Sequence, residues 1–164
     1  MTIAVAVRTD SAVVFAADSK LTTRGIVGLE DDGSPRWVEQ TYDNATKIAQ
    51  DRSGTLMAMA AGPANIGRMA ATDFIATQTL DWQDGRAEQD EQVASIVAAM
   101  VEQKRAFWST TQVPPAEWPG PTILLAAPFA ADLSPRVWRV NLDGEGSQLE
   151  EILVEPGGAT RRFI

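Results

Sequence analysis

Apolar runs near the start of the chain predict two short strands. Residues 2–7 and 12–17 are apolar and flank a polar stretch at residues 9–11, an arrangement typical of a β-hairpin. Neither run alternates between apolar and polar positions, and the same is true of residues 56–61. Strands that are apolar on both faces are covered on both sides in layered domains. We therefore expect these strands to lie in the middle of a layered domain.

The following segment is polar and then returns to a strand pattern. Residues 19–46 contain glycines, an acidic run and a proline, which predicts a long loop with one short strand at residues 36–40. Residues 46–50 and 55–61 predict a second hairpin. The residues between them, 51–54, combine Asp, Ser and Gly, which favour a tight turn.

Two helices are predicted in the middle of the chain. The first begins at Gly62-Pro63, because proline loses no hydrogen bond at the first helical position, and it runs to about Asp81. The second follows an acidic entry at residues 89–91, which suits the positive end of a helix dipole. Its apolar stripe has i, i+3, i+4 spacing and consists of Val93, Ile96, Val97, Met100, Val101 and Phe107.

Strands return after a proline-rich loop at residues 113–121. They are expected at residues 122–127, 136–141 and 149–154, with an Asp-Gly turn between the last two. The order of strands, two helices and strands predicts an α+β fold over residues 1–164, with the helices packed on a mostly antiparallel sheet.

Composition excludes several classes of catalytic site. The 164 residues include no cysteine and no histidine, which rules out disulfide scaffolds, cysteine nucleophiles, Cys/His zinc sites and Ser-His-Asp triads. The formal net charge of −8 disfavours binding to nucleic acids. The acidic stretches at residues 30–33 and 141–146 lack the spacing of a calcium loop, so they are interpreted as a loop and a turn.

Other partners and locations are also limited by the sequence. No dinucleotide-binding or P-loop motif is present, and neither a cofactor nor a metal ion is predicted. The apolar run at the N-terminus lacks a basic region and is too short for a signal peptide or a membrane span. These features predict a cytoplasmic protein that does not bind membranes.

Four residues could together perform acyl transfer without histidine: Thr2, Asp18, Lys47 and Gly62. If Met1 is removed, the Thr2 hydroxyl lies beside its own α-amino group, whose pKa of about 8 leaves a neutral fraction that acts as general base. A Lys47 ammonium held by Asp18 would lower the pKa of both groups. Gly62, at the start of the predicted helix, would donate its amide N–H to an oxyanion. Taken singly, each residue is better explained by a structural role: Thr2 begins a strand, Asp18 is a turn residue, Lys47 is a surface lysine and Gly62 is a helix N-cap.

The segments that hold these residues resemble the β-type subunits of proteasomes and the bacterial HslV peptidase, which are N-terminal nucleophile hydrolases. Residues 2–8 and 13–19 are similar to the opening strands of that family, residues 44–48 to its catalytic-lysine strand, and residues 59–62 to the strand before its first helix. The resemblance implies a four-layer αββα sandwich. Members of the family continue beyond the point that corresponds to Ile164, so we expect the sandwich to be incomplete at its C-terminal end.

The resemblance also implies roles for the candidate residues. Thr2 would be the nucleophile and, through its amine, the base. Asp18 and Lys47 would tune its charge, and Gly62 would supply the oxyanion donor. The implied reaction is hydrolysis of peptide bonds in peptides or unfolded proteins, by a homo-oligomeric ring that works with an ATP-dependent unfoldase. The segment between Asp18 and Lys47 is longer than in the family, which predicts an inserted flap or rim near residues 20–43.

Two alternatives remain open. The chain could be a non-catalytic proteasome-like subunit or assembly scaffold, which a retained Met1 would indicate because it blocks the amine of Thr2. It could also be a small-amide acylase of the same superfamily that is active as an isolated protomer, because a fold does not determine its substrate. For either a subunit or an enzyme, we expect subunit contacts on the helical faces around Phe74 and Phe107.

Overall fold

The described residues form an α+β protein with two α-helices and mostly antiparallel sheets. A computed structural model describes residues 4–9, 12–33, 35–42, 45–63, 65–82, 85–127, 135–152 and 160–163. Within those ranges, neither helix combines the length and the apolar character that crossing a membrane requires.

The largest sheet has five strands in the order β11-β10-β9-β6-β5, and every neighbouring pair is antiparallel. The strands are β5 (Ile48–Gln50), β6 (Met57–Ala61), β9 (Thr122–Ala127), β10 (Arg136–Asn141) and β11 (Gln148–Glu151). The predictions for β9 and β10 are confirmed at both ends. The last predicted strand, at residues 149–154, begins one residue earlier than expected, and its described part ends at Glu151.

A second sheet has three strands in the order β12-β1-β2. The strands are β1 (Ala4–Arg8), β2 (Val13–Ala17) and β12 (Thr160–Phe163). The hairpin of β1 and β2 was predicted, and its turn is closed by the hydrogen bond from the Thr9 amide to the Ala12 carbonyl at 2.8 Å. The sequence did not predict β12, because its polar residues show no strand pattern.

The first helix is shorter than predicted because glycines with positive φ occupy its expected first turns. Gly62 has φ +80° and Gly67 has φ +82°, a conformation that a right-handed helix cannot use. Gly67 instead turns the chain between two short strands. These elements are β7 (Asn65–Ile66), β8 (Met69–Ala70) and the helix α1 (Ala71–Thr77). The prediction that Gly62-Pro63 opens a helix reaching Asp81 is therefore wrong.

The second helix, α2 (Arg86–Trp108), begins before the acidic residues that were expected to open it. Most of its predicted apolar stripe is buried, from Val93 to Val101. The buried stripe also continues into a polar residue at each end, Gln89 and Lys104. A polar side chain at a core position needs hydrogen-bond partners, so these two residues indicate specific contacts at the ends of α2.

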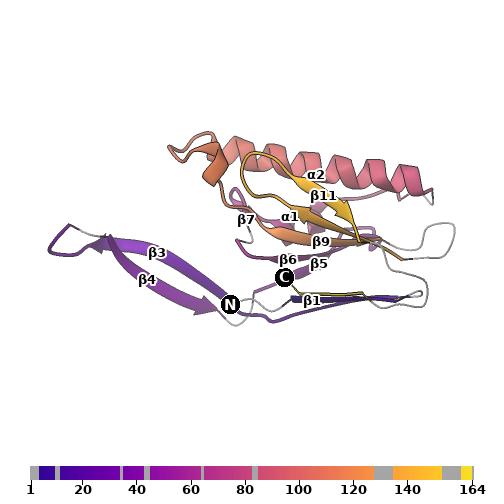
Figure 1. Ribbon diagram of the computed structural model, residues 1–164, viewed down its shortest axis with the longest axis horizontal. Coiled ribbons are helices and arrows are strands. Elements are labelled where there is room, and N and C mark those ends of the chain that lie inside the picture. The colour runs from indigo at the N-terminus through magenta and orange to yellow at the C-terminus, as the bar shows by residue number, and fades with distance from the viewer. Residues whose placement is uncertain are drawn as a thin grey trace.

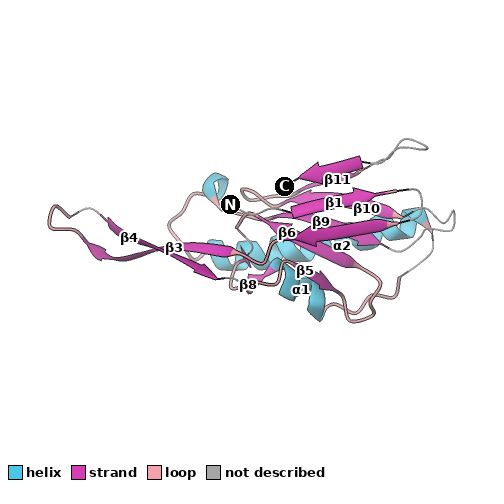
Figure 2. Ribbon diagram, turned by 90° about the horizontal axis from the view of Figure 1, so that it is seen from below, coloured by secondary structure: helices cyan, strands magenta, loops and turns pink. Residues whose placement is uncertain are grey.

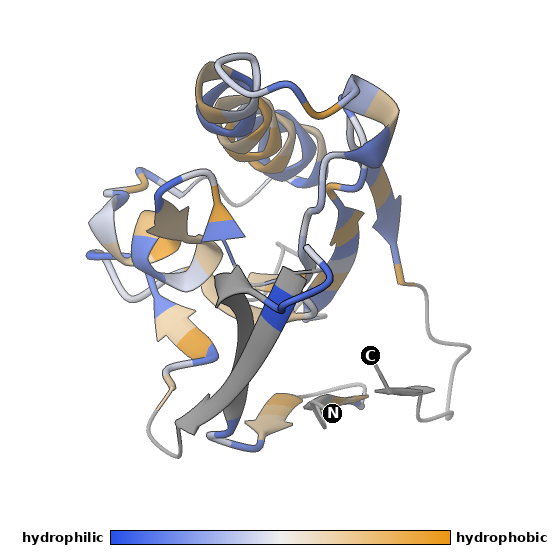
Figure 3. Ribbon diagram, turned by 90° about the vertical axis from the view of Figure 1, so that its left-hand side faces the viewer, coloured by the Kyte–Doolittle hydropathy of each residue, from blue (hydrophilic) through white to orange (hydrophobic). Residues whose placement is uncertain are grey.

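Side chains along the central strands β6 and β9 alternate between two apolar clusters. Ala58, Ala60, Ile123 and Leu125 join the cluster that includes α1 and α2, and the residues between them join the cluster that includes β1 and β2. In Figure 1, α2 accordingly lies along one side of the five-stranded sheet and β1 along the other. Figure 3, which looks from one end of the molecule, shows the same separation, with α2 at the top and the β1–β2 hairpin at the bottom.

The segment that was expected to be mostly loop is a two-stranded ribbon, so that prediction is wrong, but the short strand expected at residues 36–40 is confirmed. The strands β3 (Leu21–Leu29) and β4 (Pro35–Tyr42) pair along their length. The Gly33 amide donates to the Glu30 carbonyl at 2.9 Å and closes the turn. The register shifts next to Gly28, a position where glycine tolerates a bulge, so this glycine interrupts the pairing without ending the strand. The ribbon extends away from the rest of the chain, as Figure 2 shows.

Arg136 joins the N-terminal end of α2 to β10 and β11. Its guanidinium donates to both carboxylate oxygens of Glu151, at 2.9 and 2.7 Å, and to Asp90 at 2.8 Å. It also lies 4.6 Å from the centre of the Trp138 ring. Arg136 is 1% exposed, so these partners must replace the water that its charge loses on folding.

We expect Glu151→Gln to lower the free energy of unfolding by about 1–3 kcal/mol at pH 7, because Arg136 would lose a charged partner. The hydrogen bond from Arg136 lowers the pKa of Glu151 below its usual value of 4.5. As the pH falls below 4.5, the unfolded chain therefore binds the proton first. The stability that this carboxylate contributes is complete above that pH and is lost as the pH falls through the lowered pKa.

Urea unfolding between neutral and acidic pH measures this effect. Glu151→Gln should lose less stability with acid than the original chain does. Glu150→Gln is the matched control, because Glu150 is 53% exposed and pairs with an exposed arginine, Arg139. If both variants had the same stability and the same acid dependence, the assignment of the Arg136 contacts would be contradicted.

Candidate active site

Several strand ends meet at one end of the two larger sheets. Asp18 directly follows β2, Lys47 directly precedes β5, and Gly62 directly follows β6. Because β5 and β6 are antiparallel, the start of one lies beside the end of the other. The Ala60 amide accordingly donates to the Lys47 carbonyl at 3.0 Å. Lys47 and Gly62 therefore lie at the same end of the five-stranded sheet.

The structure brings two of the predicted residues, Asp18 and Lys47, into direct contact. The Lys47 Nζ lies 2.5 Å from Asp18 Oδ1. The Lys47 side chain is 7% exposed and that of Asp18 is 26% exposed, so the pair is largely shielded from water. It links the three-stranded sheet to the five-stranded sheet. Next to it, the Ala45 amide donates to the Ser19 carbonyl at 2.9 Å, which closes the base of the β3–β4 ribbon.

The turn between β5 and β6 fixes the position of Lys47. The Asp51 carboxylate accepts hydrogen bonds from the amides of Thr55 at 2.7 Å and Leu56 at 2.8 Å, and from the Ser53 hydroxyl. Burial raises the pKa of Asp51, but these hydrogen bonds outweigh it and hold the pKa below its usual value. The turn sets the register of β5 against β6, and this register places Lys47 at the open end of the sheet.

Gly62 lies at the end of β6 but does not open a helix. The next helix begins only at Ala71, so the expected help of a helix dipole for an oxyanion is absent at Gly62. The group at Gly62 that could still donate to an oxyanion is its backbone amide, and the positive φ of this glycine turns the chain at that point. The part of the prediction that assigned Gly62 to a helix N-terminus is therefore corrected.

Gly62 lines a pocket of about 280 Å³ beside the end of β6. The lining residues are small or polar: Ala61, Gly62, Pro63, Gly120, Thr122 and Asp143. The sequence interpretation placed Thr122 in a strand and Asp143 in a turn, and gave neither a role in the site. Their local sequence carries no signal for one, because they reach Gly62 only through the pairing of β9 with β6, where Thr122 lies opposite Ala61.

A buried lysine in α2, Lys104, binds the chain segments next to this pocket. The Lys104 ammonium donates to the carbonyls of Gly144 at 2.6 Å, Trp118 at 3.3 Å and Leu142. Burial lowers the pKa of Lys104, and the Asp143 carboxylate acts in the opposite direction. These bonds tie the segment before β9 to the segment after β10. Lys104 thus holds together the two segments that contribute Gly120 and Asp143 to the pocket.

The remaining predicted residue, Thr2, lies outside the described residues. The first described strand, β1, begins two residues later at Ala4, which is paired with Ala17, the neighbour of Asp18. In the part of the chain that the structure describes, no three acidic side chains are grouped in a way that could hold a metal ion.

No protein-family model matches this sequence, and no curated protein matches it either.

Proposed function

We propose that the chain is an N-terminal threonine hydrolase of the proteasome β and HslV type, which cleaves peptide bonds through an acyl-enzyme on Thr2. The ion pair of Lys47 with Asp18 is the observation that carries the proposal. Burying an ammonium has a desolvation cost that an apolar residue would avoid. A fixed positive charge at the end of two sheets is what activation of a hydroxyl needs in a chain without histidine.

The pairing of β1 with β2 supports Thr2 as the group that this charge serves. Ala4 lies opposite Ala17, directly before Asp18. Two residues of chain extend at most about 7 Å, so an N-terminus at Thr2 starts within reach of the ion pair. An α-amino group has a pKa of about 8 in the absence of neighbours. With the Lys47 ammonium beside it, the Thr2 amine would have a lower pKa and would be largely in its basic form at neutral pH.

The reaction would proceed in two steps. In the first, the Thr2 hydroxyl oxygen attacks the amide carbon and its proton passes to the Thr2 amine. The Gly62 N–H donates to the oxyanion, the C–N bond breaks, and the amine returns its proton to the leaving nitrogen. In the second step, water attacks the ester carbon with the amine again as base, which releases the acid and restores the hydroxyl.

The two apolar clusters support the four-layer αββα sandwich that the resemblance implies. The helices, the five-stranded sheet and the three-stranded sheet would be three of its layers. The outer face of the three-stranded sheet carries Val14, which is 58% exposed, and a fourth layer would cover it. We further propose that the protein assembles into a cytoplasmic ring and receives unfolded polypeptide from an ATP-dependent unfoldase.

Removal of the Thr2 hydroxyl tests the nucleophile. We expect Thr2→Ala to lower the hydrolysis of fluorogenic peptide amides by about 1000-fold or more, because no ester can form. Thr2→Ser should retain activity, since it keeps a hydroxyl beside the amine. Thr9→Ala, an exposed threonine just beyond the other end of β1, is the matched control and should match the original chain. Full activity of Thr2→Ala would disprove the mechanism.

Removal of the ammonium tests the group that activates Thr2. We expect Lys47→Met to lower kcat by about 100- to 1000-fold, because a preorganised charge is lost from the site. Lys47→Arg keeps a positive charge beside Asp18 and should recover part of the rate. Lys20→Met removes an exposed lysine close to the site in sequence and should leave kcat unchanged. Equal kcat for Lys47→Met and Lys20→Met would contradict the assigned role of the ion pair.

A further inference from the structure

Among the described residues, the β3–β4 ribbon is a separate two-stranded sheet. Each strand pairs with the other and with no further strand among the described residues. Isolated two-stranded hairpins are marginally stable in water and usually need a third strand or a helix. In Figures 1 and 2 the ribbon extends away from both larger sheets and from both helices. A contact with another chain would therefore stabilise the ribbon.

The tip of the ribbon is strongly acidic. Glu30, Asp31 and Asp32 follow one another at the turn, and all three are exposed. Gly33, with φ +81°, and its hydrogen bond to Glu30 define the shape of the turn. The tip thus presents adjacent carboxylates at the point of the described chain that projects furthest from the sheets (Figure 1). A positively charged surface is the natural complement of such a tip.

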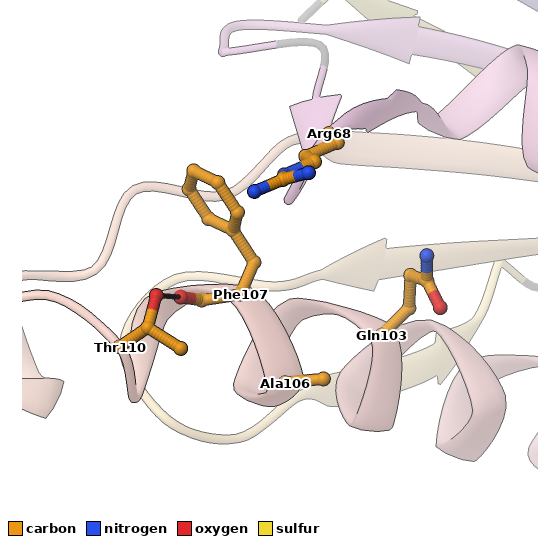
Figure 4. A pocket seen from close by; sticks show the side chains of 5 residues that line it. All are labelled: Arg68, Gln103, Ala106, Phe107 and Thr110. Atoms are coloured by element: carbon orange, nitrogen blue, oxygen red, sulfur yellow. Dashed lines mark hydrogen bonds between the residues drawn. The ribbon is translucent and has the colours of Figure 1, made fainter.

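A pocket with a cation at its edge lies between α2 and the turn that joins β7 to β8. It encloses about 230 Å³, and its lining residues are Arg68, Gln103, Ala106, Phe107 and Thr110. Figure 4 shows the Phe107 ring rising from the helix toward Arg68, with Gln103 further along the same helix. Arg68 is exposed and has no ion-pair partner within the described ranges. Its charge is therefore available to an acidic group outside this copy of the chain.

Gly67 brings the turn of this pocket close to the helix. A Cβ at this position would come within 2.9 Å of the Phe107 Cβ, so only glycine permits the observed approach. Its φ of +82° is also the left-handed conformation that glycine favours. Arg68, the next residue, is therefore held at a fixed place beside Phe107, and the pocket is already formed without a ligand.

We propose that the ribbon is an assembly arm whose acidic tip docks at the Arg68–Phe107 pocket of a second copy of this chain. The carboxylates of the tip and the Arg68 guanidinium have opposite charges, so two copies of this chain supply both sides of the contact. The arm is long enough to extend to a neighbouring copy: strands of nine and eight residues at about 3.3 Å per residue give a ribbon about 30 Å long.

The contact joins different surfaces on the two copies. Such head-to-tail contacts produce closed rings or open filaments rather than simple two-fold dimers. The arm begins close to the Asp18–Lys47 pair, so docking would also hold the base of the arm in place beside the candidate active site. The inference does not depend on the hydrolase chemistry, because association can be measured in a variant without the Thr2 hydroxyl.

Charge reversal tests the docking. Sedimentation velocity and native mass spectrometry of the full chain in the Thr2→Ala background should show an oligomer. Reversing the tip with Glu30→Lys and Asp31→Lys, or reversing the pocket with Arg68→Glu, should weaken association by about tenfold or more. The variant with all three changes restores opposite charges and should recover the original association. Arg52→Glu, an exposed arginine in the β5–β6 turn, is the matched control and should associate like the parent.

Three results would overturn the proposal. The first is a parent chain that stays monomeric over the whole concentration range. The second is tip and pocket variants that associate as well as Arg52→Glu does. The third is a combined variant that remains as weak as the single reversals, because a direct pair of charges must be restored by reversing both. Circular dichroism and urea unfolding of each variant establish that the fold is retained.

Discussion

The central strands β6 and β9 must be buried on both faces, and the rest of the structure depends on this constraint. Alternate residues of each strand belong to different apolar clusters, so helices are needed on one side and the β1–β2 hairpin on the other. Small residues such as Ala58 and Ala60 allow the close approach. Buried charged groups need polar partners, and two of them, Arg136 and Lys47, lie where strands begin. The Asp18–Lys47 pair is such a group, and it joins the two sheets at that edge.

Local sequence predicts an element well where one short motif determines the backbone. The Asp51 turn is an example, because a single carboxylate satisfies the amides of the turn, and the flanking strands follow. Local sequence fails where glycine supports more than one conformation. Gly62 and Gly67 interrupt the predicted helix with positive φ, and Gly28 accompanies a shift of register in a ribbon that was expected to be a loop. The choice between those conformations depends on neighbours that are remote in the sequence.

Parts of the candidate site could likewise be predicted from local sequence, and other parts could not. The resemblance of short motifs was enough to single out Asp18 and Lys47, which do meet, whereas Thr2 lies outside the described residues. The wall of the pocket beside Gly62 could not be predicted, since it forms only when β9 pairs with β6. The periodicity of α2 did contain one unused signal. Lys104 falls on the buried stripe, so a lysine at that position already indicated a cation with internal acceptors.

The central claim is that a buried ammonium prepares the N-terminal threonine for acyl transfer. Its most direct test is the intact mass of the protein purified from cells, before and after treatment with a peptide β-lactone. The account predicts a chain lighter by one methionine that starts at Thr2 and gains one acyl group there, located by peptide mapping. A chain that keeps Met1 and gains no acyl group would contradict the claim and would favour a non-catalytic subunit.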